Sequence, residues 1–204
     1  MTDQEFVEDR RRALSESVEY FSAKNKIERE LWVCVEFLKN LGVRFEDKEA
    51  RPWSDEPPDV VFRDARFEIK EILDPGRRRH AEYKLDLEKA QAAKKPEDFL
   101  EPFTPLDITP LQIADRLRPE LEKLALHYEP SARARMDLLF YVNLQDHFLL
   151  KGPMPGRAAF AAYGWRSISV LKGWGALVYY AAEDAPTFLR SSEGVLLQRN
   201  SLPE

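Results

Sequence analysis

The sequence of 204 residues lacks the features that mark several classes of protein. Cys34 is its only cysteine, so the chain forms no intrachain disulfide, which indicates a reducing compartment such as the cytoplasm. Three histidines, His80, His127 and His147, lack the spacing of metal ligands on a helix. No apolar run approaches the roughly eighteen residues of a membrane span. The start, Met1–Glu5, is polar and acidic, unlike a signal peptide. We therefore expect a cytoplasmic protein without membrane contact.

The composition fits one globular domain over residues 1–204, because 44% of the residues are apolar and 11% are aromatic. The net charge of −5 disfavours a protein that wraps nucleic acid over its whole surface. Residues 77–95 differ, with seven Lys or Arg against three acids and a formal charge of +4. Such a segment could bind the phosphates of a nucleic acid, or it could be a helix of mixed charge that faces solvent. The candidates for phosphate contact are Arg77, Arg78, Arg79, His80 and Lys84.

The order of the expected elements indicates an α/β fold, with a mixed sheet flanked by helices. Thr2 and Glu5 have the spacing of a capping box, and Thr109, Pro110 and Gln112 have that of a second helix start. Cys34 falls within an apolar helical stripe and is interpreted as a core residue. Further helices are expected at 25–42, 79–94 and 110–128, with strands at 43–46, 136–144, 167–171 and 176–181.

The segment around residues 58–72 predicts a hairpin that carries charged side chains. Both arms are rich in Val, Ile and Phe, and a short polar turn joins them. Because side chains alternate along a strand, Glu68 and Lys70 share one face. Pairing around Asp64–Ala65 would place Asp59 opposite Lys70 and diagonal to Glu68. Two carboxylates beside an ammonium suit metal-assisted hydrolysis of a phosphodiester, whereas the alternative is the solvent face of an ordinary antiparallel strand.

Pro58–Asp59, with Glu68 nine residues after Asp59 and Lys70 next on that face, resembles the core of the PD-(D/E)XK nuclease superfamily. The preceding helix, residues 27–42, looks like the first core helix of archaeal Holliday-junction resolvases. The chain most resembles an uncharacterised bacterial family described only as candidate endonucleases. The motifs lie within residues 26–95. This resemblance implies a restriction-endonuclease-like mixed sheet, with residues 1–24 as a helical extension.

The resemblance also implies the roles of individual residues. Asp59, Glu68 and the main-chain carbonyl of Ile69 would bind Mg²⁺ or Mn²⁺, and Lys70 would position the attacking water. In the superfamily an acid on the first helix faces the metal, and either Glu28 or Glu30 could supply it here.

The expected function is therefore that of a metal-dependent endonuclease with nucleic acid, most simply DNA, as its partner. A nuclease fold that only binds nucleic acid or a protein is the alternative, and a homodimer is left open.

Overall fold

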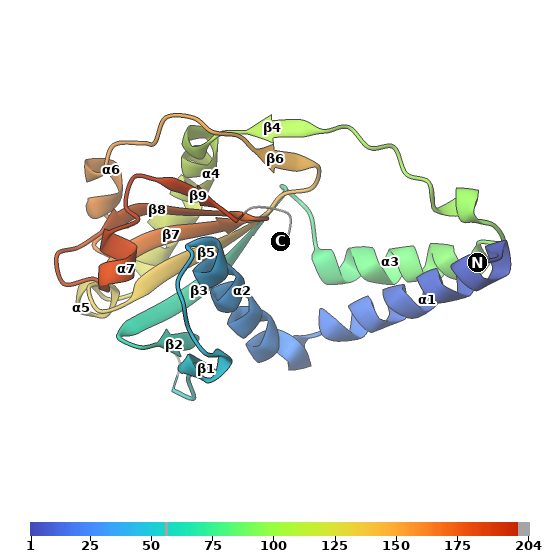
Figure 1. Ribbon diagram of the computed structural model, residues 1–204, viewed down its shortest axis with the longest axis horizontal. Coiled ribbons are helices and arrows are strands. Elements are labelled where there is room, and N and C mark those ends of the chain that lie inside the picture. Colours follow the sequence, from blue (N-terminus) through green and yellow to red (C-terminus); the bar gives the residue numbers. More distant parts are fainter. Residues whose placement is uncertain (56, 200–204) are drawn as a thin grey trace. The chain divides into compact units, whose positions relative to one another are not determined.

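The structure, a computed structural model, describes residues 1–55 and 57–199. The chain forms two compact units, one of residues 1–28 with 73–104 and the other of residues 29–72 with 105–204 (Figure 1). The expected motif range, 26–95, contributes residues to both units. No helix in the described part of the chain is long and apolar enough to cross a membrane.

The first unit is built on two helices that lie side by side, α1 (Asp3–Tyr20) and α3 (Arg79–Ala92). The expected capping box at Thr2 is confirmed, because its hydroxyl accepts from the Glu5 amide. An aromatic contact connects the two helices, because Phe21, which follows α1, stacks on Tyr83 of α3 with ring centroids 4.8 Å apart. The unit also contains the 3₁₀ helices η1 (Ala23–Asn25) and η3 (Pro96–Phe99).

The second unit contains a mixed sheet, as the sequence predicts. Among the described residues the sheet has seven strands in the order β1-β2-β3-β5-β7-β8-β9. The pair β5–β7 is parallel, whereas β1–β2, β2–β3, β7–β8 and β8–β9 are antiparallel. The strands are β1 (Ala50–Pro52), β2 (Val60–Phe62), β3 (Ala65–Leu73), β5 (Asp137–Asn143), β7 (Ser167–Lys172), β8 (Gly175–Ala181) and β9 (Leu196–Gln198).

Several short elements complete the chain. The proline-rich stretch before Pro110, expected to be a loop, contains the strand β4 (Leu106–Ile108), which pairs in parallel with β6 (His147–Leu149). The remaining elements are η2 (Asp47–Glu49), α5 (Pro130–Arg133), α6 (Ala158–Ala161) and α7 (Thr187–Arg190).

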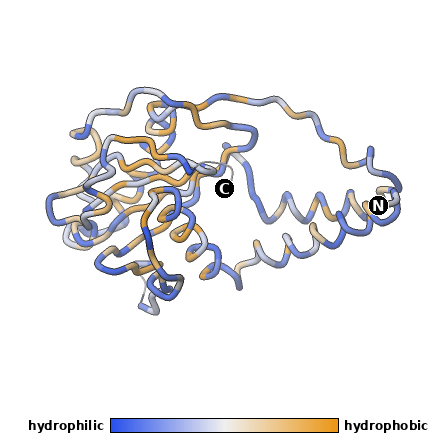
Figure 2. Tube along the Cα trace, in the orientation of Figure 1, coloured by the Kyte–Doolittle hydropathy of each residue, from blue (hydrophilic) through white to orange (hydrophobic). Residues whose placement is uncertain are grey.

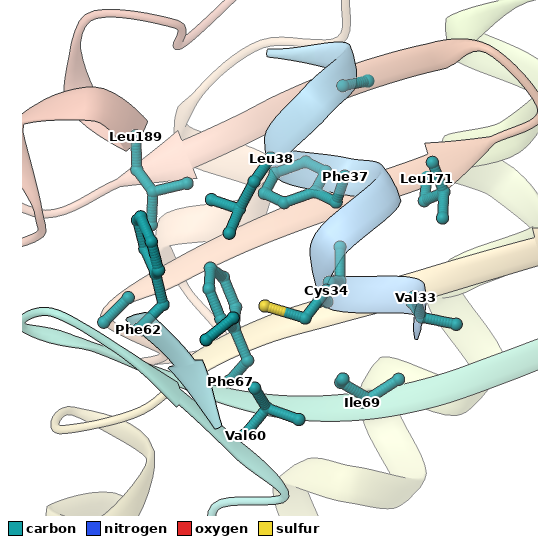
Figure 3. Packing of buried hydrophobic residues seen from close by; sticks show 14 of the residues in the cluster. Val33, Cys34, Phe37, Leu38, Val60, Phe62, Phe67, Ile69, Leu171 and Leu189 are labelled. Atoms are coloured by element: carbon teal, nitrogen blue, oxygen red, sulfur yellow. The ribbon is translucent and has the colours of Figure 1, made fainter. Parts of the chain in front are cut away.

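Helix α2 (Lys26–Asn40) buries its apolar stripe against the hairpin strands (Figure 3). The rings of Phe37 and Phe67 meet edge to face, with centroids 5.9 Å apart. Cys34 is fully buried in this cluster, which confirms its interpretation as a core residue. Burial raises the pKa of its thiol, so the thiol stays protonated and unreactive.

Helix α4 (Pro110–His127) begins at the predicted cap, because Thr109 accepts from the Gln112 amide. It packs on the face of the sheet opposite α2: Leu138 and Phe140 of β5 join the α4 cluster, whereas Leu139 between them joins the α2 cluster. Figure 2 shows the apolar residues concentrated along these central strands. The expected sheet flanked by helices is therefore confirmed.

The strand expected at residues 43–46 is wrong, because the first strand begins at Ala50. Gly42, with φ 72°, ends the helical segment, and the chain then runs without strand pairing. Phe45 still packs edge to face on Phe62, and the Arg44 carbonyl accepts from the Arg63 guanidinium at 2.9 Å. The Arg63 side chain thus donates to the Arg44 carbonyl, which in a strand would instead accept from a backbone amide of the neighbouring strand.

Candidate active site

The hairpin of β2 and β3 carries the predicted acids, but in a different register. Val60 pairs with Phe67 and Phe62 with Ala65, and the Asp59 amide donates to the Phe67 carbonyl at 2.9 Å, so Asp59 lies beside Phe67, next to Glu68, rather than opposite Lys70. The predicted register is therefore wrong. Its cause is the position of the turn, which lies at Arg63–Asp64, one residue earlier than predicted; Arg63 there adopts φ 52° and ion-pairs with Glu49 at 2.7 Å. The two acids are closer along the ladder than the sequence suggested.

The alternation along β3 separates the hairpin into two faces, as predicted. Phe67 and Ile69 point into the cluster under α2, and Glu68 and Lys70 share the other face. The Lys70 ammonium donates to Glu68 Oε1 in an ion pair. Glu68 is only 3% exposed whereas Lys70 is partly exposed, so the acid end of this pair is buried and the pair is no ordinary solvent-facing charge pair.

A second donor fixes Glu68. Tyr128, at the end of α4, donates its hydroxyl to the same Oε1 at 2.6 Å, and its ring packs against Trp165 with centroids 5.4 Å apart. From the sequence, Tyr128 is only the last residue of the helix expected at 110–128. Its hydroxyl was the available signal, because a tyrosine on a buried helix face usually requires a polar partner.

Asp59 is held by the backbone of the neighbouring strand. It is 6% exposed, and its Oδ2 accepts a hydrogen bond of 2.8 Å from the Ile69 amide. The amide that follows Glu68 is thus bonded to the carboxylate of Asp59. Glu68 precedes this amide in the chain, and Asp59 on the adjacent strand accepts its hydrogen bond, so one peptide group links the two acids.

The donor set fits a hard divalent cation. Asp59 and Glu68 are buried and Lys70 is partly exposed, and together the three carry a formal charge of −1, which a cation would offset. Mg²⁺ characteristically takes one or two carboxylates and completes its octahedron with waters and substrate oxygens. No three His, Cys, Asp or Glu side chains within residues 1–55 and 57–199 come together as a fuller metal site. Asp59 and Glu68 therefore remain the metal ligands that we predict.

The helical acids lie on α2, and the arginine segment is part of the first unit. Glu28 is exposed and Glu30 half-buried on α2, the helix that packs on the Phe67 and Ile69 face of β3. Which of them faces a metal stays a prediction.

The segment 77–84 belongs to the first unit. Arg77 ion-pairs with Glu82 at 2.8 Å, and Arg79 lies over the Phe21 ring at 3.9 Å. Arg78 and Lys84 are exposed, and His80 is half-buried. Their contact with nucleic acid stays a prediction.

A buried acid that sequence reasoning missed anchors the hairpin. Asp137, fully buried at the start of β5, accepts from the Arg66 amide and the Ser167 hydroxyl, each at 2.9 Å. The Arg166 guanidinium ion-pairs with it and also donates to the Asp64 carbonyl in the hairpin turn at 2.9 Å. Burial raises the pKa of Asp137, and Arg166 acts against that rise. This network fixes the hairpin to β5 and β7.

Residues 2–201 match the family described as "Putative endonuclease, protein of unknown function (DUF1780)". The chain belongs to this family. The match supports the expected endonuclease class, but the family description names no metal and no DNA substrate.

The DUF1780 chain is also similar to a solved Pseudomonas aeruginosa strain PAO1 protein of unknown function, described as belonging to the monooxygenase superfamily. The two share 27% identity with a TM-score of 0.66, over 98% of this chain and 97% of the other. No curated protein matches the chain.

Proposed function

We propose that this chain is a metal-dependent nuclease of the PD-(D/E)XK type that hydrolyses phosphodiester bonds in DNA. One observation carries the proposal: the buried Glu68 forms an ion pair with the partly exposed Lys70 on β3, and the buried Asp59 carboxylate accepts from the amide of Ile69 between them. Burying a charged group costs free energy, so we interpret the buried acids Asp59 and Glu68 as functional rather than stabilising. The family description supports the same class of reaction.

Each residue has a distinct part in the proposed reaction. Asp59 and Glu68 would hold Mg²⁺ or Mn²⁺, with the Ile69 carbonyl as a third oxygen. The bound ion would polarise a phosphoryl oxygen and acidify water. Lys70, positioned by Glu68, would orient the attacking water and offset negative charge in the transition state. Tyr128 restrains Glu68, because its hydroxyl donates to the oxygen that also pairs with Lys70.

The alternative function is a nuclease fold that only binds nucleic acid or a protein. One observation favours it: Glu68 Oε1 already accepts from both Lys70 and Tyr128, so this oxygen is satisfied without a metal. The monooxygenase description of the similar Pseudomonas protein points to no residue of this site. Metal binding separates the two functions, because a module that only binds a macromolecule has no need of a cation between Asp59 and Glu68.

Binding of Mn²⁺ is expected to raise the thermal stability of the wild-type chain through these two acids. A ligand at about 100 times its Kd stabilises a protein by about 2.7 kcal/mol. The variants Asp59→Asn and Glu68→Gln should lose most of the Mn²⁺-dependent rise in Tm. Asp55→Asn, an exposed acid on the approach to the hairpin, is the matched control and should keep it. An equal rise in all four proteins would place the metal elsewhere.

A further inference from the structure

The face of the hairpin that carries Glu68 also borders a cationic groove. The groove has a volume of about 950 Å³, and the lining residues that the structure describes all belong to the second unit. Among the described residues, six cations and three acids line it, a formal charge of +3 within a chain of net charge −5. The cations are Lys48, Arg51, Arg63, Arg66, Arg135 and Arg166.

Half of these cations are already paired and half are available. Lys48, Arg63 and Arg166 each form an ion pair with an acid of the chain. Within the described residues, the other three have exposed guanidinium groups that form neither ion pairs nor hydrogen bonds. They are Arg51, Arg66 and Arg135. Guanidinium groups bind phosphate through paired N–H donors, so an anionic ligand would satisfy them.

The sheet register aligns these arginines with the candidate active site. Arg51 of β1 pairs with Val61 of β2, and Val61 pairs with Arg66 of β3, so the two arginines stand in one cross-strand row. Strands in a sheet lie about 4.8 Å apart, which sets their Cα atoms on the order of 10 Å apart. Arg66 is two residues before Glu68, and its side chain therefore lies on the same face of β3.

An aromatic side chain and the approach to Asp59 complete the groove. Trp53 lines it and is 42% exposed, next in sequence to β1. Pro57 and Pro58 also line it, so the groove reaches the residue before Asp59. Exposed aromatics in a basic groove are suited to stacking on unpaired bases, which a closed duplex does not offer.

We propose that this groove binds a single nucleic-acid strand, with phosphates on Arg51, Arg66 and Arg135 and a base stacked on Trp53. The proposal rests on the proposed function for the identity of the polyanion and names the strand form of its substrate. It places the main nucleic-acid contact in the second unit rather than at Arg77–Arg79.

Anisotropy of a fluorescein-labelled oligothymidine, measured with the full chain in EDTA across a series of salt concentrations, tests this proposal without any cleavage. Replacing the three available arginines by Ala should weaken binding at least about tenfold. It should also make the slope of log K against log[salt] less steep by about two, since each single-strand phosphate contact contributes about 0.7 to that slope. Trp53→Ala should weaken binding by about fivefold or more, with an unchanged slope.

Matched controls separate the groove from net charge and from exposed aromatics. Arg116→Ala, Arg118→Ala and Lys123→Ala together remove the same charge from exposed positions of α4, and Trp174→Ala removes another exposed indole. Both controls should bind as wild type does. Circular dichroism should show that all variants are folded.

Three results would overturn the groove: no binding by wild type at low salt, an unchanged affinity and slope in the Arg51, Arg66 and Arg135 variant, or binding lost only when Arg77–Arg79 are replaced. A preference for duplex over single strands would contradict the stated ligand. These outcomes differ from failure of the proposed function. If binding depends on the groove residues but no metal-dependent cleavage occurs, the groove proposal is supported and the proposed nuclease function is contradicted.

Discussion

Replacing Lys70 by methionine is expected to reduce the rate of nucleic-acid cleavage by about 10²–10³, the usual effect of losing one preorganised group that stabilises transition-state charge. The methionine keeps most of the side-chain volume and removes only the ammonium. Single-turnover cleavage with Mn²⁺, compared between wild type and the variant, measures the loss.

The structure changes the expected stability of this variant. From the sequence alone, Lys70 is an exposed strand lysine whose loss should change stability by less than about 0.5 kcal/mol. In the structure its side chain is 28% exposed and pairs with a Glu68 side chain that is 4% exposed. Removing the Lys70 ammonium leaves the Glu68 carboxylate with the Tyr128 hydroxyl as its remaining side-chain donor among those observed. We therefore expect the free energy of unfolding to fall by about 1–3 kcal/mol.

Lys151→Met, at an exposed position of the same unit, is the matched control and should change neither rate nor stability. Cleavage by the Lys70 variant at the wild-type rate, after contaminating nucleases are excluded, would place the active site away from this hairpin. The assignments of Asp59 and Glu68 would then fall with it.

Asp137→Ala is expected to lower the free energy of unfolding by about 3–5 kcal/mol, because it leaves the Arg166 guanidinium inside the protein without its counter-ion. It also removes the acceptor of the Arg66 amide and the Ser167 hydroxyl. Urea unfolding followed by circular dichroism measures the change. Asp115→Ala, which breaks an exposed ion pair with Arg118 on α4, should cost about 0.5 kcal/mol or less.

A double replacement, Asp137→Leu with Arg166→Met, separates charge burial from loss of the contact. Replacing a whole buried pair by apolar groups is often neutral or stabilising, so the double variant should recover much of the lost stability. Equal losses for Asp137→Ala and Asp115→Ala would show that the network does not hold the hairpin in place.

Local rules predicted the parts of the site that depend on neighbouring residues. Glu68 and Lys70 meet because side chains two apart on a strand share a face. The start of α4 follows from Thr109, Pro110 and Gln112, which form the cap among themselves.

The register and the partners depend on distant residues and could not be predicted in this way. The turn at Arg63 is held by Glu49 and by the Arg44 carbonyl, and no local pattern links these positions. Tyr128 reaches Glu68 across 60 residues of sequence, and Asp137 reaches the Arg66 amide across 71. Tertiary packing decides these contacts.

The central claim is that Asp59, Glu68 and Lys70 form a metal-dependent phosphodiesterase site. Incubation of wild type and Glu68→Gln with labelled single-stranded, duplex and branched DNA and with RNA, each with Mn²⁺ or with EDTA, tests it most directly. We predict that wild type cleaves DNA with Mn²⁺ and not with EDTA, and that Glu68→Gln, folded as judged by circular dichroism, does not. Intact nucleic acid in every wild-type reaction, or equal cleavage by the variant, would contradict the claim.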